Sequence, residues 1–168
     1  MVKLEWFESE VPNGMKVTQV YGVVFTEDGR TLLKSEYKNG ELVYSLAGGT
    51  PEDFDENTEA TLRREFIEEV NTSLKNEVYY LGYQEVDECN GSPKYAQIRL
   101  TALIDNIGNK QPDPDNGKTY DRILVGAKKA IELLDWKATG EGIINKAVET
   151  AEKYFNIKVY NGDEIIEV

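Results

Sequence analysis

The sequence predicts an α/β fold, in the form of an α+β sandwich whose mixed β-sheet is packed between helices. Segments rich in β-branched and aromatic residues fill much of the chain between residues 17 and 46. A helical pattern follows at residues 58–70, and further extended segments and a second amphipathic helix come after it. Strands on both sides of a central helix, with another helix near the end, favour a sheet covered by helices.

The part of the chain before the helix contains three expected strands, at residues 17–27, 31–37 and 41–46. Asn39 and Gly40 form a strong hairpin-turn signal, so the second and third strands should pair. Gly48 and Gly49 then interrupt the strand pattern. The acidic residues 50–57, which include a proline, are expected to form a loop.

The helix at residues 58–70 has a recognisable signal at each end. Asn57 is a good N-cap residue, and Glu59 lies in the first turn, where the helix dipole favours a negative charge. Asn71 follows the helix, and asparagine tolerates the left-handed backbone conformation that commonly ends helices.

The remaining segments continue the alternation of strands and helices. We expect extended segments at 78–88 and 94–105, a loop at 106–119, a strand at 120–125, helices at 128–136 and 141–155, and a terminal hairpin within 157–168. The length of 168 residues, without repeats or linkers, suits a single domain that spans 1–168. Alternation of Tyr79, Tyr80, Tyr83 and Tyr95 fits sheet packing at least as well as stacking on a base.

The composition excludes several classes of chemistry and of partner. The chain has no histidine, which excludes Ser-His-Asp and Cys-His catalysis and any zinc site built on imidazole. Asp, Glu, Lys or Tyr must then act as the general base, and Mg²⁺ or Mn²⁺ becomes the natural metal. The net charge of −12 disfavours binding of a nucleic acid polymer. No apolar run approaches the ~20 residues that span a bilayer.

The single cysteine, Cys89, and an N-terminus interrupted by acidic residues favour a cytoplasmic location. Trp6 and Phe7 are expected to fasten this N-terminal segment to the core.

The helix at 58–70 separates an apolar face from an acidic face. With Arg64 at zero on a helical wheel, the glutamates 68, 65 and 69 lie at about 40°, 100° and 140°. Like charges four residues apart repel one another, so this arrangement costs stability unless a cation lies among the carboxylates. Considered alone, the helix is better explained as an amphipathic helix with a solvated acidic face.

The sequence around this helix favours a catalytic role for the acidic face. Gly48-Gly49, six residues, Glu56, seven residues and then Arg64-Glu65-Phe66-Ile67-Glu68-Glu69-Val70-Asn71-Thr72 resemble the Nudix box. The family pattern is Gly, five residues, Glu, seven residues and Arg-Glu-U-x-Glu-Glu-x-Gly-U, where U is a bulky aliphatic residue. The chain departs from it by one extra residue before Glu56, by Asn71 for glycine and by Thr72 for the aliphatic residue.

The resemblance implies a Nudix-type fold and a metal-dependent hydrolase that cleaves a phosphoanhydride in a nucleoside diphosphate linked to another group. Glu68 and Glu69 would be the main ligands of Mg²⁺ or Mn²⁺. Glu65 would bind a second ion or help to activate water, and the carbonyl of Gly49 would complete the coordination. Arg64 would orient Glu56 and the acidic cluster. The resemblance also implies a further acid from outside the box, and the sequence does not select among Glu85, Asp87, Glu88, Asp113 and Asp115.

Two alternatives remain open at this stage. The first is a catalytically silent domain of the same fold that binds a nucleotide or a partner, and the second is an acidic interaction domain that binds a basic partner. The expected ligand of the hydrolase is a small nucleotide-type molecule, with neither a nucleic acid polymer nor a membrane as partner. Formation of a homodimer is left open, and so is the identity of the nucleoside diphosphate derivative.

Overall fold

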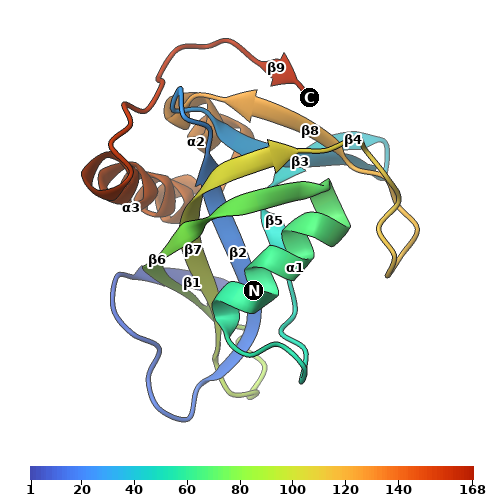
Figure 1. Cartoon of the computed structure of the whole chain (residues 1–168). Coiled ribbons are helices and arrows are strands. Elements are labelled where there is room, and N and C mark those ends of the chain that lie inside the picture. The colour runs from blue at the N-terminus through green and yellow to red at the C-terminus, as the bar shows by residue number, and fades with distance from the viewer.

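The computed structural model describes all residues, 1–168, and contains nine strands and three helices (Figure 1). The strands are β1 (Lys3–Phe7), β2 (Lys16–Phe25), β3 (Thr31–Lys38), β4 (Glu41–Ser45), β5 (Ala47–Gly49), β6 (Thr72–Asp87), β7 (Tyr95–Ile107), β8 (Asp121–Val125) and β9 (Ile166–Glu167). The helices are α1 (Thr58–Val70), α2 (Ala127–Leu134) and α3 (Lys137–Tyr154).

The strands form one mixed sheet, as the sequence predicts. Its order is β1-β6-β7-β2-β3-β8-β9, with β4 paired to β3 and β5 paired to β2. The β2–β7 pair is parallel, whereas the other pairs are antiparallel. Strands β2 and β3 pair only between Phe25 and Thr31, and beyond this point β4 and β5 lie between them. The two long strands therefore diverge at one end of the sheet.

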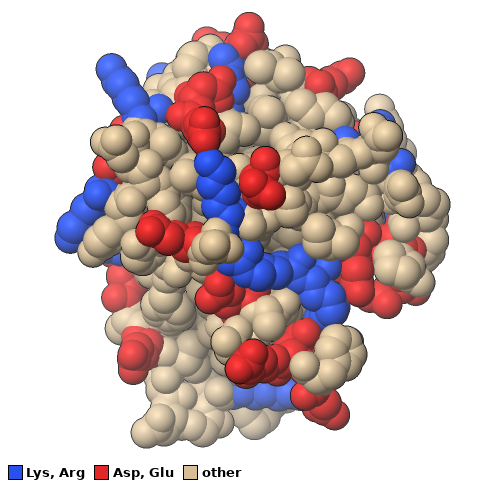
Figure 2. All heavy atoms as spheres, in the orientation of Figure 1, with Lys and Arg blue, Asp and Glu red and all other residues tan.

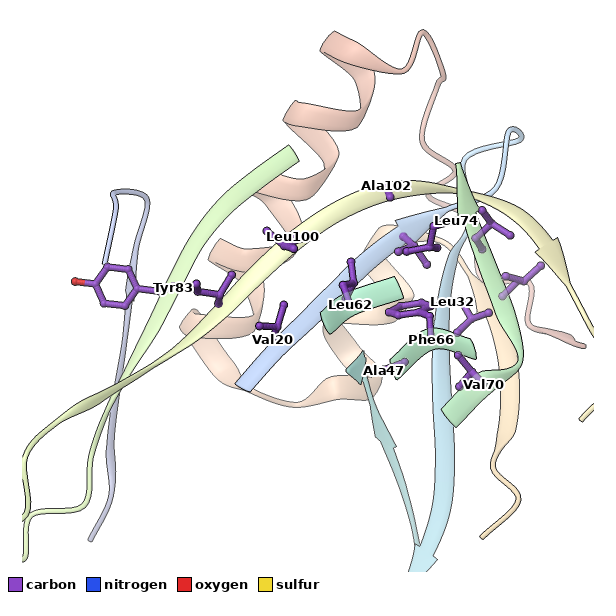
Figure 3. Close-up of a cluster of buried hydrophobic side chains, with 14 of the residues drawn as sticks. Val20, Leu32, Ala47, Leu62, Phe66, Val70, Leu74, Tyr83, Leu100 and Ala102 are labelled. Carbon is purple, nitrogen blue, oxygen red and sulfur yellow. The ribbon is translucent and has the colours of Figure 1, made fainter. Parts of the chain in front are cut away.

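Helices cover both faces of the sheet, and a hydrophobic core lies beneath each. Leu62 and Phe66 of α1 pack on one face against Val20, Leu32 and Leu100 (Figure 3). Helices α2 and α3 cover the opposite face with a second set of buried residues, among them Ala127, Ala130, Leu134, Ile143, Ile144 and Ala147. This layering is the predicted sandwich, and it leaves the acidic face of α1 directed away from the core.

Several element boundaries differ from those predicted. Strand β6 begins at Thr72, directly after α1, and α3 begins at Lys137 rather than at residue 141. The predicted terminal hairpin is wrong, because only Ile166–Glu167 is a strand and it pairs with β8. The glycine pair does not merely interrupt a strand, since Ala47–Gly49 forms β5.

Local signals account for the elements that the sequence does predict. The turn at Asn39 and Gly40 has φ angles of 52° and 81°, as a two-residue hairpin with both central residues at positive φ requires. The Asn57 side chain accepts a hydrogen bond of 2.8 Å from the Ala60 N–H and caps α1. Asn71 ends the helix in the left-handed conformation, with a φ of 52°.

The N-terminal segment is fastened to the sheet as expected. Strand β1 pairs with β6, and the Phe7 ring stacks on Tyr83 with 5.2 Å between the ring centroids. None of the three helices combines the length and the hydrophobicity that crossing a bilayer would require.

Candidate active site

The glycine pair brings the strand β5 backbone into close contact with its neighbours. A Cβ atom at Gly48, which has a φ of 150°, would overlap the Val20 carbonyl oxygen and the backbone of Tyr21. A Cβ atom at Gly49 would overlap the carboxyl group of Glu65. Both positions therefore require glycine, and the requirement at Gly49 arises from contact with the acidic face of α1.

Three carboxylates converge beside β5. Glu65 and Glu68 of α1 and Asp115 each offer an oxygen, and these oxygens lie within 4.8 Å of one another. Asp115 belongs to the loop of residues 108–120 between β7 and β8. Its N–H donates a 2.9 Å hydrogen bond to the buried Asp113 carboxylate, which fixes its position within the loop. Of the five acids that the sequence left undecided, Asp115 is the one that joins Glu65 and Glu68.

The end of helix α1 anchors this loop. Asn71 accepts a 2.8 Å hydrogen bond from the Gln111 N–H through its side-chain oxygen, and its carbonyl accepts another of 2.8 Å from the Gly108 N–H. The buried Arg122 donates hydrogen bonds of 2.8 Å to the carbonyls of Val70 and Gly108. The asparagine that replaces the glycine of the family pattern thus contributes an additional side-chain contact to the loop that carries Asp115.

Arg64 lies among the carboxylates and binds several of them. It donates hydrogen bonds of 2.9 Å to Glu65 and 3.3 Å to Glu68, and another of 3.0 Å to the Thr50 carbonyl. Its other contacts are with Asp55, which accepts 3.0 Å and 2.8 Å hydrogen bonds from Nε and Nη2. This bidentate geometry is the strongest that an arginine and a carboxylate can form.

The expected contact between Arg64 and Glu56 is not formed, and this is a correction to the sequence interpretation. Glu56 is exposed, whereas the Asp55 side chain is only 5% exposed. Asp55 also accepts hydrogen bonds of 2.9 Å from the Thr61 hydroxyl and the Glu52 N–H. Hydrogen bonding to Arg64 is the main reason why the pKa of Asp55 lies well below its usual range.

Counting from the glycine explains the difference. Five residues separate Gly49 from Asp55, which is the spacing of the family pattern. The extra residue therefore lies between the acid and Arg64, not between the glycine and the acid.

Glu69 is held separately from the group formed by Glu65, Glu68 and Asp115. It is buried, and it accepts hydrogen bonds of 2.8 Å from Lys34 Nζ of β3 and 3.0 Å from the Gly48 N–H. Lys34 Nζ also lies 4.2 Å from the centre of the Tyr120 ring. Nothing in the sequence marks Lys34 as a site residue, since lysine is common in strands at the surface of a sheet.

Burial and like charge perturb the acids of this site. Desolvation raises the pKa of both Glu65 and Glu69, and it outweighs the lowering by Arg64 and Lys34 respectively. Glu68 and Glu69 add to the rise at Glu65, and Asp113 adds to that at Glu69. Raised carboxyl pKa values in a cluster are common at functional sites.

The donor set fits a divalent cation. Clustered carboxylate oxygens are the ligands that Mg²⁺ and Mn²⁺ prefer, and a cation would offset the repulsion that raises the pKa of Glu65. On the face of the molecule shown in Figure 2, acidic and basic side chains lie interspersed.

Three of the other acids that the sequence proposed lie elsewhere. Glu85 pairs with Lys94 at 2.8 Å, and Glu88 accepts a 2.6 Å hydrogen bond from the Tyr95 hydroxyl. Asp87 accepts a hydrogen bond from the N–H of Cys89, an exposed residue just after β6. These contacts give all three acids local structural roles.

Comparison with known proteins identifies the family. The model of the NUDIX domain matches residues 15–140, which is most of the chain. The chain belongs to the Nudix family. Membership supports a Nudix-type pyrophosphohydrolase over a domain that only binds a partner. Comparison with curated proteins gives no match.

Solved structures show that the Nudix fold is shared. A NUDIX hydrolase from Nitrosomonas europaea has a TM-score of 0.60 at 17% identity, with 88% of this chain and 100% of that chain covered. The pyrophosphohydrolase BsRppH from Bacillus subtilis has a TM-score of 0.56 at 20% identity, with coverage of 72% and 70%. The MutT protein from Bacillus halodurans has a TM-score of 0.54 at 21% identity, with coverage of 76% and 78%.

Proposed function

We propose that this Nudix protein is a metal-dependent hydrolase that cleaves the pyrophosphate bond in a nucleoside diphosphate linked to another group. The convergence of Glu65, Glu68 and Asp115 carries the proposal, since two elements far apart in sequence meet there in a cluster suited to a cation. A domain that only bound a nucleotide would gain nothing from such a costly group of like charges. An acidic surface for a basic partner would not need buried carboxylates.

The carboxylates of the site would bind the metal ion. Glu68 and Asp115 would hold Mg²⁺ or Mn²⁺, with Glu69 and the carbonyl of Gly49 as further ligands, and Glu65 would bind a second ion or help to activate water. When bound, the ion neutralises the phosphate oxygens and lowers the pKa of water.

Two further residues would position this group. Arg64 keeps Glu65 and Glu68 in place, and Asp55 in turn fixes the guanidinium plane of Arg64. The exposed Glu56 is left without a part in the chemistry.

Glu65 is suited to take the proton of the attacking water. Burial raises the pKa of its carboxyl group in the chain without a metal ion, and a glutamate carboxylate is a usual general base. The water oxygen would form a bond to phosphorus, the proton would pass to Glu65, and the bridging P–O bond would break. The electron pair of that bond would leave with the second phosphate. These residues would act only on the pyrophosphate of the substrate, so they do not determine which nucleoside or which linked group it carries.

A product-release screen tests the proposal. Nucleoside triphosphates, dinucleoside polyphosphates, nucleotide sugars and ADP-ribose would each be incubated with Mg²⁺, with Mn²⁺ and with chelator. We expect cleavage of at least one class, abolished by chelator and lowered by orders of magnitude in Glu68→Gln. Glu59→Gln is the matched control, because Glu59 lies on the same helix and pairs with Arg63.

A chain that binds nucleotides but cleaves none of these substrates would favour the silent binding domain.

A further inference from the structure

A cavity of about 390 Å³ opens where β2 and β3 diverge. Its walls include Tyr21, Lys34, Gln84, Gln97, Arg99 and Trp136. Lys34 also pairs with Glu69, so the cavity begins beside the acidic cluster. Its volume lies within the roughly 300–1,000 Å³ of small-molecule sites.

Arg99 is a buried cation in this cavity without a carboxylate partner. It is 2% exposed, and only its Nη1 donates hydrogen bonds, of 3.2 Å and 3.4 Å, to the carbonyls of Gln97 and Ile98. Its Nε is buried and has no partner. The guanidinium carbon lies 4.7 Å from the centre of the Tyr21 ring and 5.6 Å from that of Trp136. Burial lowers the pKa of Arg99 to about 10, which leaves it charged at neutral pH.

A buried acceptor without a partner lines the same cavity. The Gln84 side chain donates a 3.2 Å hydrogen bond to Gln97, but its own Oε1 is buried and accepts none. Gln97 is fixed in turn by a 2.9 Å hydrogen bond to Gln19. A buried donor or acceptor without a partner destabilises the folded chain, and such groups are rare in folded proteins. A bound molecule that carries both an acceptor and a donor would satisfy the two groups together.

We infer that this cavity binds the nucleobase of the substrate and selects a 6-oxopurine such as guanine. This inference rests on the proposed function, which requires a nucleoside beside the pyrophosphate. The free edge of an arginine pairs with O6 and N7 of guanine, and the Gln84 oxygen can accept from a ring or amino N–H. Adenine presents an amino group where guanine presents O6, so it would place a donor against Arg99.

A phosphate group is the main competing ligand, because Lys34 and Lys38 line the cavity together with Arg99. The Gln84 oxygen and the Glu36 carboxylate, which also lines the cavity, would repel a phosphate. The apolar and aromatic part of the wall consists of Leu4, Tyr21, Leu46, Val86 and Trp136. Planar bases, by contrast, stack on aromatic rings and on guanidinium planes.

Binding in the presence of chelator tests the inference without any turnover. Calorimetry would compare GMP, AMP and inorganic phosphate with the wild-type chain, with Arg99→Met and with Arg99→Lys. We expect GMP to bind wild type at least about tenfold more tightly than AMP, as a bidentate arginine contact implies. Both variants should lose this preference, Arg99→Lys because lysine cannot form the two-pronged contact. Arg30→Met is the matched control, since Arg30 stacks on Tyr160 and does not line the cavity.

Equal or undetectable binding of GMP and AMP by wild type overturns the inference. So does retention of the preference in a folded Arg99 variant. Binding of inorganic phosphate that depends on Arg99 would show an anion site instead. A chain that prefers GMP but hydrolyses no substrate refutes the proposed function and leaves the base site intact, whereas a hydrolase without the preference does the reverse.

Discussion

In the structure, Arg64 is paired with Asp55 and not with the adjacent acid Glu56. Alanine substitution of each acid in turn tests this assignment. Asp55→Ala removes a bidentate ion pair whose side chains are 5% and 16% exposed, and it also removes acceptors for Thr61 and Glu52. Loss of one partner of a buried, hydrogen-bonded pair costs about 3 kcal/mol. Glu56 is exposed, so Glu56→Ala should change the free energy of unfolding by no more than about 0.5 kcal/mol.

Asp55→Ala should also lower catalytic activity more than Glu56→Ala does. Without Asp55, the Arg64 guanidinium keeps only the Thr50 carbonyl and the two acids that it positions as partners. Small displacements in an active site can cost about 10²-fold in rate. We therefore expect a fall in kcat of about tenfold or more for Asp55→Ala and near wild-type turnover for Glu56→Ala. Urea denaturation and steady-state kinetics measure the two effects. The reverse pattern, with Glu56→Ala the more damaging change, would refute the assignment.

Four further outcomes are expected. Glu69→Gln should lower turnover by orders of magnitude in a protein whose circular dichroism is unchanged, and wild-type turnover on every cleaved substrate would contradict its role as a ligand. Mg²⁺ should raise the melting temperature of wild type more than that of Asp115→Asn, as differential scanning fluorimetry can show, because binding to the folded state stabilises it. Asn71→Gly should keep the helix end but lower kcat, since the hydrogen bond to the Gln111 N–H is lost; unchanged kcat would argue against anchoring of the loop. Because the folded-state pKa of Asp55 is depressed, its stabilisation is complete above the unfolded pKa of about 3.9 and is lost as the pH falls below it. Urea titrations should therefore show a smaller acid-induced loss of stability in Asp55→Ala.

Helix α1 could be located from the sequence because its signals are local. The capping residue Asn57 and the left-handed Asn71 both act on backbone groups within a few residues, and the apolar face has the period of a helix. The hairpin at Asn39 and Gly40 is local in the same sense. Strands β1 and β5 and the start of β6 depend instead on their partners across the sheet, and no short-range pattern marks them.

The tail shows why local pattern can mislead. Two short segments on either side of Asn161-Gly162-Asp163 suggested a hairpin, but the tail contacts other segments. Tyr160 accepts a hydrogen bond from the Ala127 N–H and donates one to the Gly29 carbonyl, and Ile166 pairs with Leu124.

The acids of the site also differ in whether local sequence pattern predicts their proximity. Glu65 and Glu68 share a helix face, so their proximity follows from helix geometry. Asp115 comes from a loop 47 residues beyond Glu68, and its selection over four other acids depends on how Asn71 and Arg122 hold that loop. Two adjacent acids also left the spacing ambiguous, because a motif counted back from Arg64 selects Glu56 and one counted forward from Gly49 selects Asp55.

The repulsion predicted for the acidic face of α1 is offset by protein cations from two places. Arg64 lies between Glu65 and Glu68, and Lys34 reaches Glu69 from β3. These contacts reduce the repulsion among the carboxylates without a bound metal, yet they do not restore ordinary pKa values at Glu65 and Glu69. A divalent ion would supply the charge that is still lacking, and it would compete with Lys34 for the Glu69 carboxylate. Lys34 also lines the cavity of Arg99, so its release from Glu69 would bring a cation to the side of the site where the nucleotide is proposed to lie.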